Sequence, residues 1–189
     1  MLADAAFHDI SFLNLKGKKI MDKLIASFQV DHTRIGYGIF VSRRDTVNGA
    51  YITTFDIRMK RPNAEPAIHP NAMHTIEHVV ATYLRNSKFK DHVVYWGPMG
   101  CLTGFYFITN TAHEIMPVEM EKLIRAAFRH MANYRGDVPG ATAVNCGNYL
   151  LHDLPMAKFE AKAFLKQEWK FDYPKASRVK TGGRTFFDA

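Results

Sequence analysis

The segment 71–86 combines a metal-binding residue pattern with the hydrophobic pattern of a helix. His74, Glu77 and His78 read HxxEH, and apolar residues follow them. On a helix, residues four apart project from one face about 40° apart, so both imidazoles could reach one metal ion. Glu77 would lie close enough to share a metal-bound ligand. We therefore expect a helix here that carries a metal site.

Both cysteines of the chain, Cys101 and Cys146, lie in glycine-bearing runs. No secretory signal is recognisable at the start, so we expect free thiols and a cytoplasmic location. A structural zinc site would need four ligands at short spacings, and CxxC is absent. An open site with three protein ligands and one exchangeable water fits better, with Cys146 joining His74 and His78. Cys101 lies in a tight turn that could present a reactive thiol; an inert buried cysteine is the alternative for either residue.

The HxxEH spacing alone leaves other classes of protein open. Inverzincin metallopeptidases share it, and there the glutamate activates a metal-bound water. Such enzymes also need a third ligand, normally a glutamate on a later helix, and a longer chain, neither of which is evident here. Histidines that merely fill a half-buried helix face are the remaining alternative.

Length and composition favour one domain with a sizeable core. The chain has 189 residues, of which 47% are apolar and 13% aromatic, which argues against disorder. No apolar run approaches the length of a membrane span. The net charge of +7 arises partly after residue 170, where basic residues outnumber acidic ones. We interpret 171–189 as a basic tail; nucleic-acid binding is the less favoured alternative, because no nucleic-acid motif accompanies the charge.

The order of expected elements predicts an α+β fold, a single domain with a largely antiparallel sheet packed by helices. We expect strands over 39–41, 51–59, 92–96 and 103–109, and helices over 14–26, 71–86, about 117–131 and about 153–169. Asn48-Gly49 is a strong hairpin signal between the first two strands. Cys146 falls in a strand or loop after the break at 136–140.

Several separated blocks of the sequence recur, in the same order, in one enzyme family. They are 27–34, 55–58 with 62–63, 74–78 with 85–86, 97–106, and 145–149 with His152. They include the runs HTIEH, GPMGC and NCGNY. Over about 27–165 the chain therefore resembles the S-ribosylhomocysteine lyase family, the enzymes of autoinducer-2 synthesis in quorum sensing.

The resemblance implies a homodimeric enzyme with one divalent metal per subunit, iron(II) in the native state, although Zn²⁺ or Co²⁺ would also suit the ligands. His74, His78 and Cys146 would hold the metal together with water. The substrate would be a ribosyl thioether, taken through aldose–ketose shifts and β-elimination to homocysteine and a dihydroxypentanedione. Cys101 and Glu77 would move the protons.

The resemblance also implies a substrate site where residues of both subunits meet. Ser27, His32 and Arg58 match positions that line this site, and Arg85 matches a basic position suited to the amino-acid carboxylate. Arg58 would also help to keep the Cys101 thiol anionic. The implied organisation is an N-terminal extension over 1–26, a lyase-like domain over 27–170 and the basic tail over 171–189.

Three departures from the family pattern lie close to the chemistry. Tyr95 stands where the family has an aspartate, Gly97 where it has a serine, and Leu102 where it has arginine or glutamine. If the aspartate holds the substrate's ammonium group, its loss removes a contact worth roughly 1.5–3 kcal/mol. A divergent paralogue acting on another ribosyl thioether or sugar is therefore an alternative, and a non-catalytic metal-binding protein is another.

Overall fold

A computed structural model describes residues 30–174 of the chain. The architecture below belongs to the compact unit that begins at Asp31. Several predictions lie outside the described residues: the helix over 14–26, the site residue Ser27, and the part of the basic tail after Pro174.

A four-stranded antiparallel sheet forms the centre of the unit, in the order β1-β2-β4-β3. Its strands are β1 (Gly38–Val47), β2 (Ala50–Arg58), β3 (Val93–Pro98) and β4 (Gly104–Thr111). The predicted hairpin turn joins β1 to β2, with φ at 49° for Asn48 and 79° for Gly49. Positive φ at both central residues is the geometry that suits the twist of two hairpin strands.

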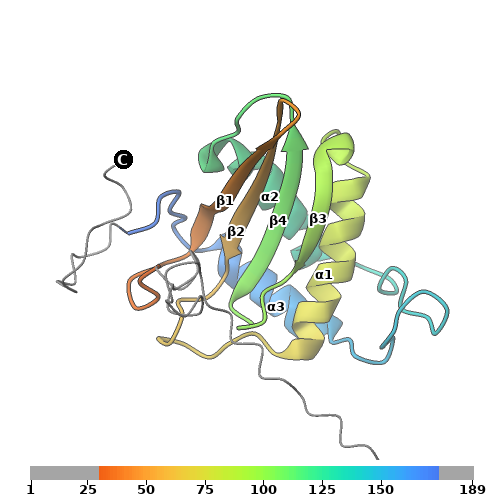
Figure 1. Cartoon of the computed structure of the whole chain (residues 1–189). Helices are drawn as coiled ribbons and strands as arrows, with labels where there is room; N and C mark the ends of the chain where they lie inside the picture. Colours follow the sequence, from red (N-terminus) through yellow and green to blue (C-terminus); the bar gives the residue numbers. More distant parts are fainter. Residues whose placement is uncertain (1–29, 175–189) are drawn as a thin grey trace, which may run out of the picture. The chain divides into compact units, whose positions relative to one another are not determined.

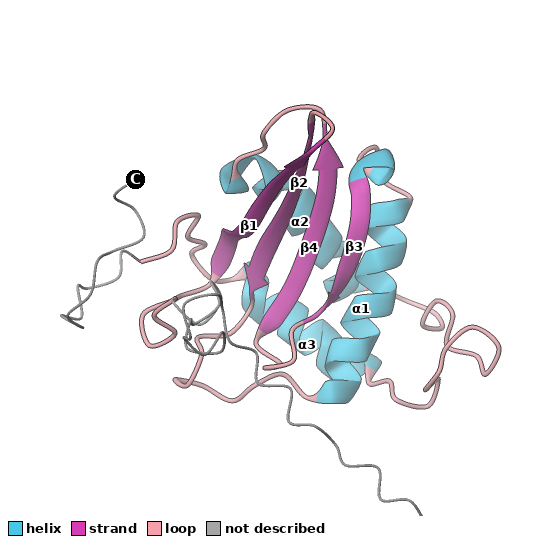
Figure 2. Ribbon diagram, in the orientation of Figure 1, coloured by secondary structure: helices cyan, strands magenta, loops and turns pink. Residues whose placement is uncertain are grey.

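Three α-helices lie against one face of this sheet (Figure 1, Figure 2). They are α1 (Pro70–Arg85), α2 (Pro117–Asn133) and α3 (Leu154–Leu165), and a single 3₁₀ turn, η3 (Lys90–His92), precedes β3. The predicted α+β class with an antiparallel sheet is confirmed. Within the described part of the chain, no helix is long and apolar enough to cross a membrane.

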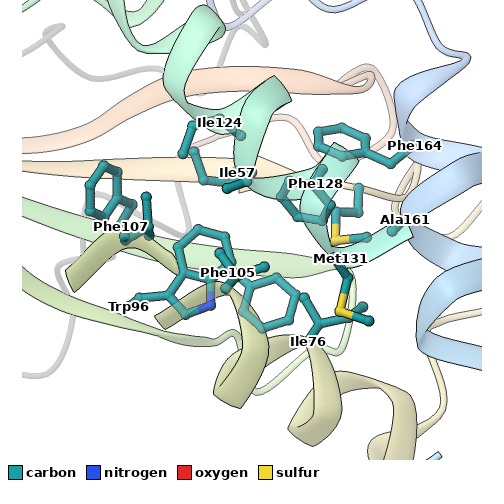
Figure 3. Packing of buried hydrophobic residues seen from close by; sticks show 14 of the residues in the cluster. Ile57, Ile76, Trp96, Phe105, Phe107, Ile124, Phe128, Met131, Ala161 and Phe164 are labelled. Carbon is teal, nitrogen blue, oxygen red and sulfur yellow. The ribbon is translucent and has the colours of Figure 1, made fainter. Parts of the chain in front are cut away.

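The core forms between the helices and the inward face of the sheet (Figure 3). Phe55 and Ile57 of β2 and Phe105 and Phe107 of β4 are fully buried. Because side chains alternate along a strand, the residues between them point to the other face. Asp56 lies between Phe55 and Ile57, and Arg58 follows Ile57, so β2 carries a polar pair on the face away from the helices.

Several predicted boundaries differ from the structure. The first strand, predicted over 39–41, extends over Gly38–Val47. The last helix ends at Leu165, short of the predicted Trp169. Lys166 and Gln167 form i→i−3 bonds that close the helix, and the Trp169 indole N–H donates to the Phe164 carbonyl. In addition, β3 runs through Gly97 to Pro98, where the sequence predicted a turn.

The segment after α3 returns to the sheet beside β1. Lys170 forms a parallel bridge with Gly38; the Ile39 N–H donates to the Lys170 carbonyl, and the Lys170 N–H donates to the Tyr37 carbonyl, both at 2.9 Å. A Cβ on Gly38 would lie 1.9 Å from the Lys170 oxygen, and its φ is 151°. Glycine at this position therefore permits the close backbone contact.

Candidate metal and thiol site

Helix α1 begins as its sequence predicts and orients the HxxEH residues. The His69 side chain accepts a hydrogen bond from the Asn71 N–H, and Pro70 occupies the first turn, where its missing N–H costs nothing. The apolar residues of α1 are buried against the sheet. His74, Glu77 and His78 are half-buried on its other side, so α1 presents them away from the core.

Cys146 completes a three-ligand cluster with the two α1 histidines. Its Sγ lies 3.4 Å from His74 Nε2 and 3.7 Å from His78 Nε2. Tetrahedral coordination with typical metal–nitrogen and metal–sulfur bonds would separate these atoms by about 3.6 Å. Cys146 lies in a loop, and its thiol is free. The predicted ligands therefore come together with the separations a metal requires.

Backbone carbonyls orient both imidazole rings. His74 Nδ1 lies 2.8 Å from the Leu151 oxygen, and His78 Nδ1 lies 2.7 Å from the Pro139 oxygen. A carbonyl only accepts, so each Nδ1 carries the proton and each Nε2 keeps a lone pair toward Cys146. This is the usual outer-shell arrangement of metal-binding histidines. The donor set and its supports thus fit a divalent metal.

His152 is a neighbour of this cluster to which the sequence assigned no role. One nitrogen of His152 and the three ligand atoms all lie within 4.8 Å of one another, and its ring stacks on His74 with centroids 4.3 Å apart. Burial lowers the pKa of His152, and the nearby His74 and His78 lower it further. His152 occurs in a matched block of the sequence, but only the fold shows that it reaches the metal ligands.

Thr75 fixes the tautomer of His152. The Thr75 hydroxyl donates to the Asn71 carbonyl at 2.8 Å and lies 3.3 Å from His152 Nδ1. The Thr75 hydroxyl has only one proton, and it donates that proton to the Asn71 carbonyl. The His152 Nδ1–H must therefore donate to the Thr75 oxygen. The buried Nε2 then carries a lone pair, and it has no hydrogen-bond partner among the described residues.

A pocket of about 460 Å³ opens beside the ligands. Glu77 lines it together with the ligands His74 and Cys146. The remaining lining residues come from α1, the turn after β3 and the Cys146 loop: Pro70, Met73, Pro98, Met99, Gly100, Leu102, Gly147, Asn148 and Leu151. Both chain neighbours of Cys101, Gly100 and Leu102, belong to this lining, and Cys101 itself does not.

Cys101 is exposed and faces polar groups of β2 and of its own turn. Its Sγ lies 3.0 Å from Thr103 Oγ1 and 3.8 Å from Arg58 Nη1. Arg58 Nη1 also donates to Thr103 Oγ1. With that oxygen accepting from Arg58, the Thr103 hydroxyl proton is available to Cys101. A cation and a hydroxyl donor therefore both favour the thiolate.

Arg58 is held by a buried ion pair. Its side chain is only 4% exposed, and its Nε and Nη2 donate to the two oxygens of Asp56. Burial raises the pKa of Asp56, while Arg58 and a hydrogen bond from Tyr173 oppose the rise. Two parallel N–H···O bonds fix the guanidinium plane. Arg58 thus reaches Cys101 in a defined orientation.

Two further predicted substrate residues, His32 and Arg85, lie within the described part of the chain. His32 is half-buried, and its charge lowers the pKa of Asp56, which places it near the Arg58 pair. Arg85 is exposed and donates to the carbonyls of Val93 and Val94. It lies about 16 Å beyond His74 along the helix axis. The structure therefore does not bring Arg85 to the metal pocket of its own chain.

Two of the departures from the implied family pattern, Tyr95 and Gly97, depend on each other for space. A Cβ on Gly97 would lie 1.9 Å from the Tyr95 hydroxyl oxygen, so the tyrosine occupies the space a serine side chain would need. Leu102 adopts a positive φ of 58°, which is uncommon for a residue with a side chain. It lines the pocket and packs against the core.

The fold and this site define an α+β protein with a His₂Cys metal-ligand set and an arginine-supported thiol. The family model described as S-ribosylhomocysteinase (LuxS) matches residues 25–174. The chain belongs to this family.

Curated relatives agree with the family match. An S-ribosylhomocysteine lyase of Phocaeicola vulgatus is 53% identical over 146 residues, 77% of this chain and 89% of that protein. One of Porphyromonas gingivalis is 50% identical over 147 residues, 76% and 89% of the two chains. One of Clostridium beijerinckii is 48% identical over 145 residues, 75% and 88% of the two chains. The match therefore spans most of each relative.

Proposed function

We propose that this protein is an S-ribosylhomocysteine lyase. It breaks the carbon–sulfur thioether bond of its substrate and releases homocysteine and a dihydroxypentanedione. The observation that carries this function is the His74, His78 and Cys146 ligand set with Glu77 at the same pocket, in a chain that belongs to the lyase family. The comparisons give no support to a paralogue of different activity, since the relatives above carry the lyase name.

His74, His78 and Cys146 hold one divalent metal ion in this proposal. The mixed nitrogen and thiolate set suits Fe²⁺, Zn²⁺ or Co²⁺, and Fe²⁺ is the ion we propose. When bound, the metal supplies Lewis-acid polarisation of the substrate carbonyl, which acidifies the neighbouring C–H. His152 packs against the His74 ring and limits how that ring can turn.

Cys101 is the base for the first proton transfer. Moving a carbonyl along a sugar requires removal of a weakly acidic C–H proton by a nearby base. The Arg58 cation and the Thr103 hydroxyl favour the thiolate form of Cys101. The thiolate takes the proton from carbon, and the thiol formed returns it to the adjacent carbon, which completes one aldose–ketose shift.

Glu77 serves the later steps from the pocket wall. Its carboxylate moves protons between the substrate oxygens and carbons in the second shift. Removal of a C–H proton next to the new carbonyl then expels the β-sulfur, which leaves with the electron pair of the C–S bond. That sulfur gains a proton and departs as the homocysteine thiol.

The substrate site and the subunit arrangement form one proposal. Ser27, His32 and Arg58 bind the substrate, and Arg85 binds the amino-acid carboxylate of a substrate held by the partner subunit of a homodimer. Two observations support this arrangement. Arg85 is remote from the pocket of its own chain, and among the described helices none lies on the outer sheet face (Figure 2). The enzyme acts in the cytoplasm on a small molecule.

Product analysis tests the lyase function. Cobalt-loaded protein is incubated anaerobically with S-ribosylhomocysteine, and free thiol and dihydroxypentanedione are both quantified. The proposal expects the two products in equal amounts. The same assay with an analogue that lacks the amino group should show much weaker turnover. Absence of both products from folded, metal-bound protein would reject the proposal.

A further inference from the structure

The last described segment of the chain brings a tyrosine hydroxyl to the back of the thiol site. The Tyr173 ring stacks on Phe40, with centroids 4.8 Å apart and planes 13° apart. Its hydroxyl donates a 3.0 Å hydrogen bond to Asp56 Oδ2. Burial raises the pKa of Tyr173, and the Asp56 carboxylate raises it further. The phenol is therefore a permanent donor at neutral pH.

A continuous series of contacts runs from this phenol to the cysteine. Tyr173 donates to Asp56, Asp56 accepts both arms of Arg58, and Arg58 donates to Thr103 and Cys101. We call these five residues the Arg58 network. The Asp56 and Arg58 side chains are 3% and 4% exposed, so water has little access to compensate for a lost contact.

We propose that Tyr173 is a positioning residue that sets the reactivity of Cys101 through Asp56 and Arg58. The inference rests on the proposed role of Cys101 in the lyase reaction. The phenol fixes the plane of the Asp56 carboxylate, and the guanidinium follows that plane because it is bound in a bidentate manner. The phenol also draws negative charge toward itself, which lowers the carboxylate's repulsion of the Cys101 thiolate.

Backbone hydrogen bonds and side-chain packing fix the position of Tyr173. Lys170 pairs with the chain on both sides of Gly38, and Phe171 packs against the core. The stack on Phe40 then fixes the ring. The segment after residue 170, which the sequence assigned to a basic tail, thus supplies a side chain to the Arg58 network.

Alkylation of Cys101 by iodoacetamide tests the inference without substrate. Cobalt-loaded full-length protein is used, and peptide mapping separates Cys101 from Cys146. Tyr173→Phe keeps the ring and its stack but removes the donor. We expect its alkylation rate at pH 7 to fall about three- to tenfold. This is the change in thiolate population expected if the pKa of Cys101 rises by about half a unit to one unit. The midpoint of the pH–rate profile should move upward accordingly.

Tyr37→Phe is the matched control. Tyr37 also donates to a carboxylate, Glu65, at 2.7 Å, but that bond lies outside the Arg58 network. Its alkylation profile should match wild type. The other titratable groups that act electrostatically on the network, His32 and Tyr106, stay the same in both variants, so a difference between the two profiles reports on Tyr173.

An unchanged alkylation profile in folded Tyr173→Phe would overturn the inference. If that variant fails to fold, Phe40→Leu decides, because it keeps all five residues of the Arg58 network and removes the ring on which Tyr173 stacks. Slower alkylation of Phe40→Leu supports the inference, and wild-type alkylation overturns it. Lyase turnover is measured separately on wild-type protein, so a failure of the proposed function and a failure of this inference give different results.

Discussion

The Sγ atom of Cys146 lies 3.4 Å from Nε2 of His74, although the two residues are 72 positions apart in the chain. Helix α1 supplies the histidine, and the loop before α3 supplies the cysteine. The Pro139 and Leu151 carbonyls, on either side of Cys146, hold the two α1 histidines through their Nδ1 atoms. The same stretch of chain therefore provides one metal ligand and orients the other two.

Replacing Cys146 should remove the metal. Because only two nitrogen ligands of the set would remain, we expect Cys146→Ala to lose most of its bound metal on dialysis. Cobalt-loaded wild-type protein should show a thiolate-to-cobalt charge-transfer band that the variant lacks. His130→Ala, a substitution on the exposed part of α2, is the control and should keep both metal and band. Full metal content in Cys146→Ala would contradict the ligand assignment.

Glu77→Gln separates proton transfer from metal binding. The amide keeps the size of the side chain in the pocket but cannot act as a base, so we expect homocysteine release to fall by about 10²–10⁴. Metal content should stay at the wild-type level, because Glu77 is not among the ligands. Metal analysis and turnover on the same sample check this. Turnover within a few-fold of wild type would rule out Glu77 as a proton carrier.

Tyr95 and Gly97 should behave as a coupled pair. Gly97→Ser places a Cβ close to the Tyr95 hydroxyl, so the exposed tyrosine must turn away, and we expect destabilisation by less than about 1 kcal/mol. Combining it with Tyr95→Asp removes the clash and gives the residue pair that the resemblance implies for the family. Chemical denaturation of both single variants and the double variant gives the coupling free energy, for which we expect about 0.5 kcal/mol. Additive effects would show that the pair is independent.

Alkaline pH should destabilise the protein through Tyr173. Its pKa is raised in the folded state, whereas an unfolded tyrosine titrates near about 10. The stabilising contribution is therefore complete below about pH 10 and declines as pH rises toward the folded-state pKa, because only the unfolded chain releases the proton. Urea denaturation at pH 8 and 10.5 should show a smaller loss of stability in Tyr173→Phe than in wild type. Equal losses would contradict this.

Much of the fold could be predicted from local patterns. The hairpin at Asn48-Gly49 follows from the preference of those residues for positive φ, and α1 and α2 follow from their apolar periodicity and early prolines. The metal ligands could also be selected, because HxxEH fixes two of them and only two cysteines were available for the third. These features depend on short stretches of sequence, and the structure places the three ligands together.

The remaining parts of the site depend on contacts between distant segments. Neither His152 nor Tyr173 carries a local signal for its role, because one acquires it by stacking on His74 and the other by reaching Asp56 across the sheet. The end of α3 was also missed, since the Arg125 contact of Trp169 and the sheet bridge of Lys170 override a helical pattern there. Arg85 likewise lies away from the pocket because it is the last residue of α1. The HxxEH motif does not show this.

The most direct test of the central claim compares homocysteine release by wild-type protein and Cys101→Ala at equal cobalt content under anaerobic conditions. Cys101 is exposed and lies outside the metal-ligand set, so the variant should fold and bind metal normally. We expect rapid release from S-ribosylhomocysteine by wild type and a loss of at least about 10²-fold in the variant. Equal release by both proteins would contradict the assignment of Cys101 as the base, and no release by either would contradict the lyase function itself.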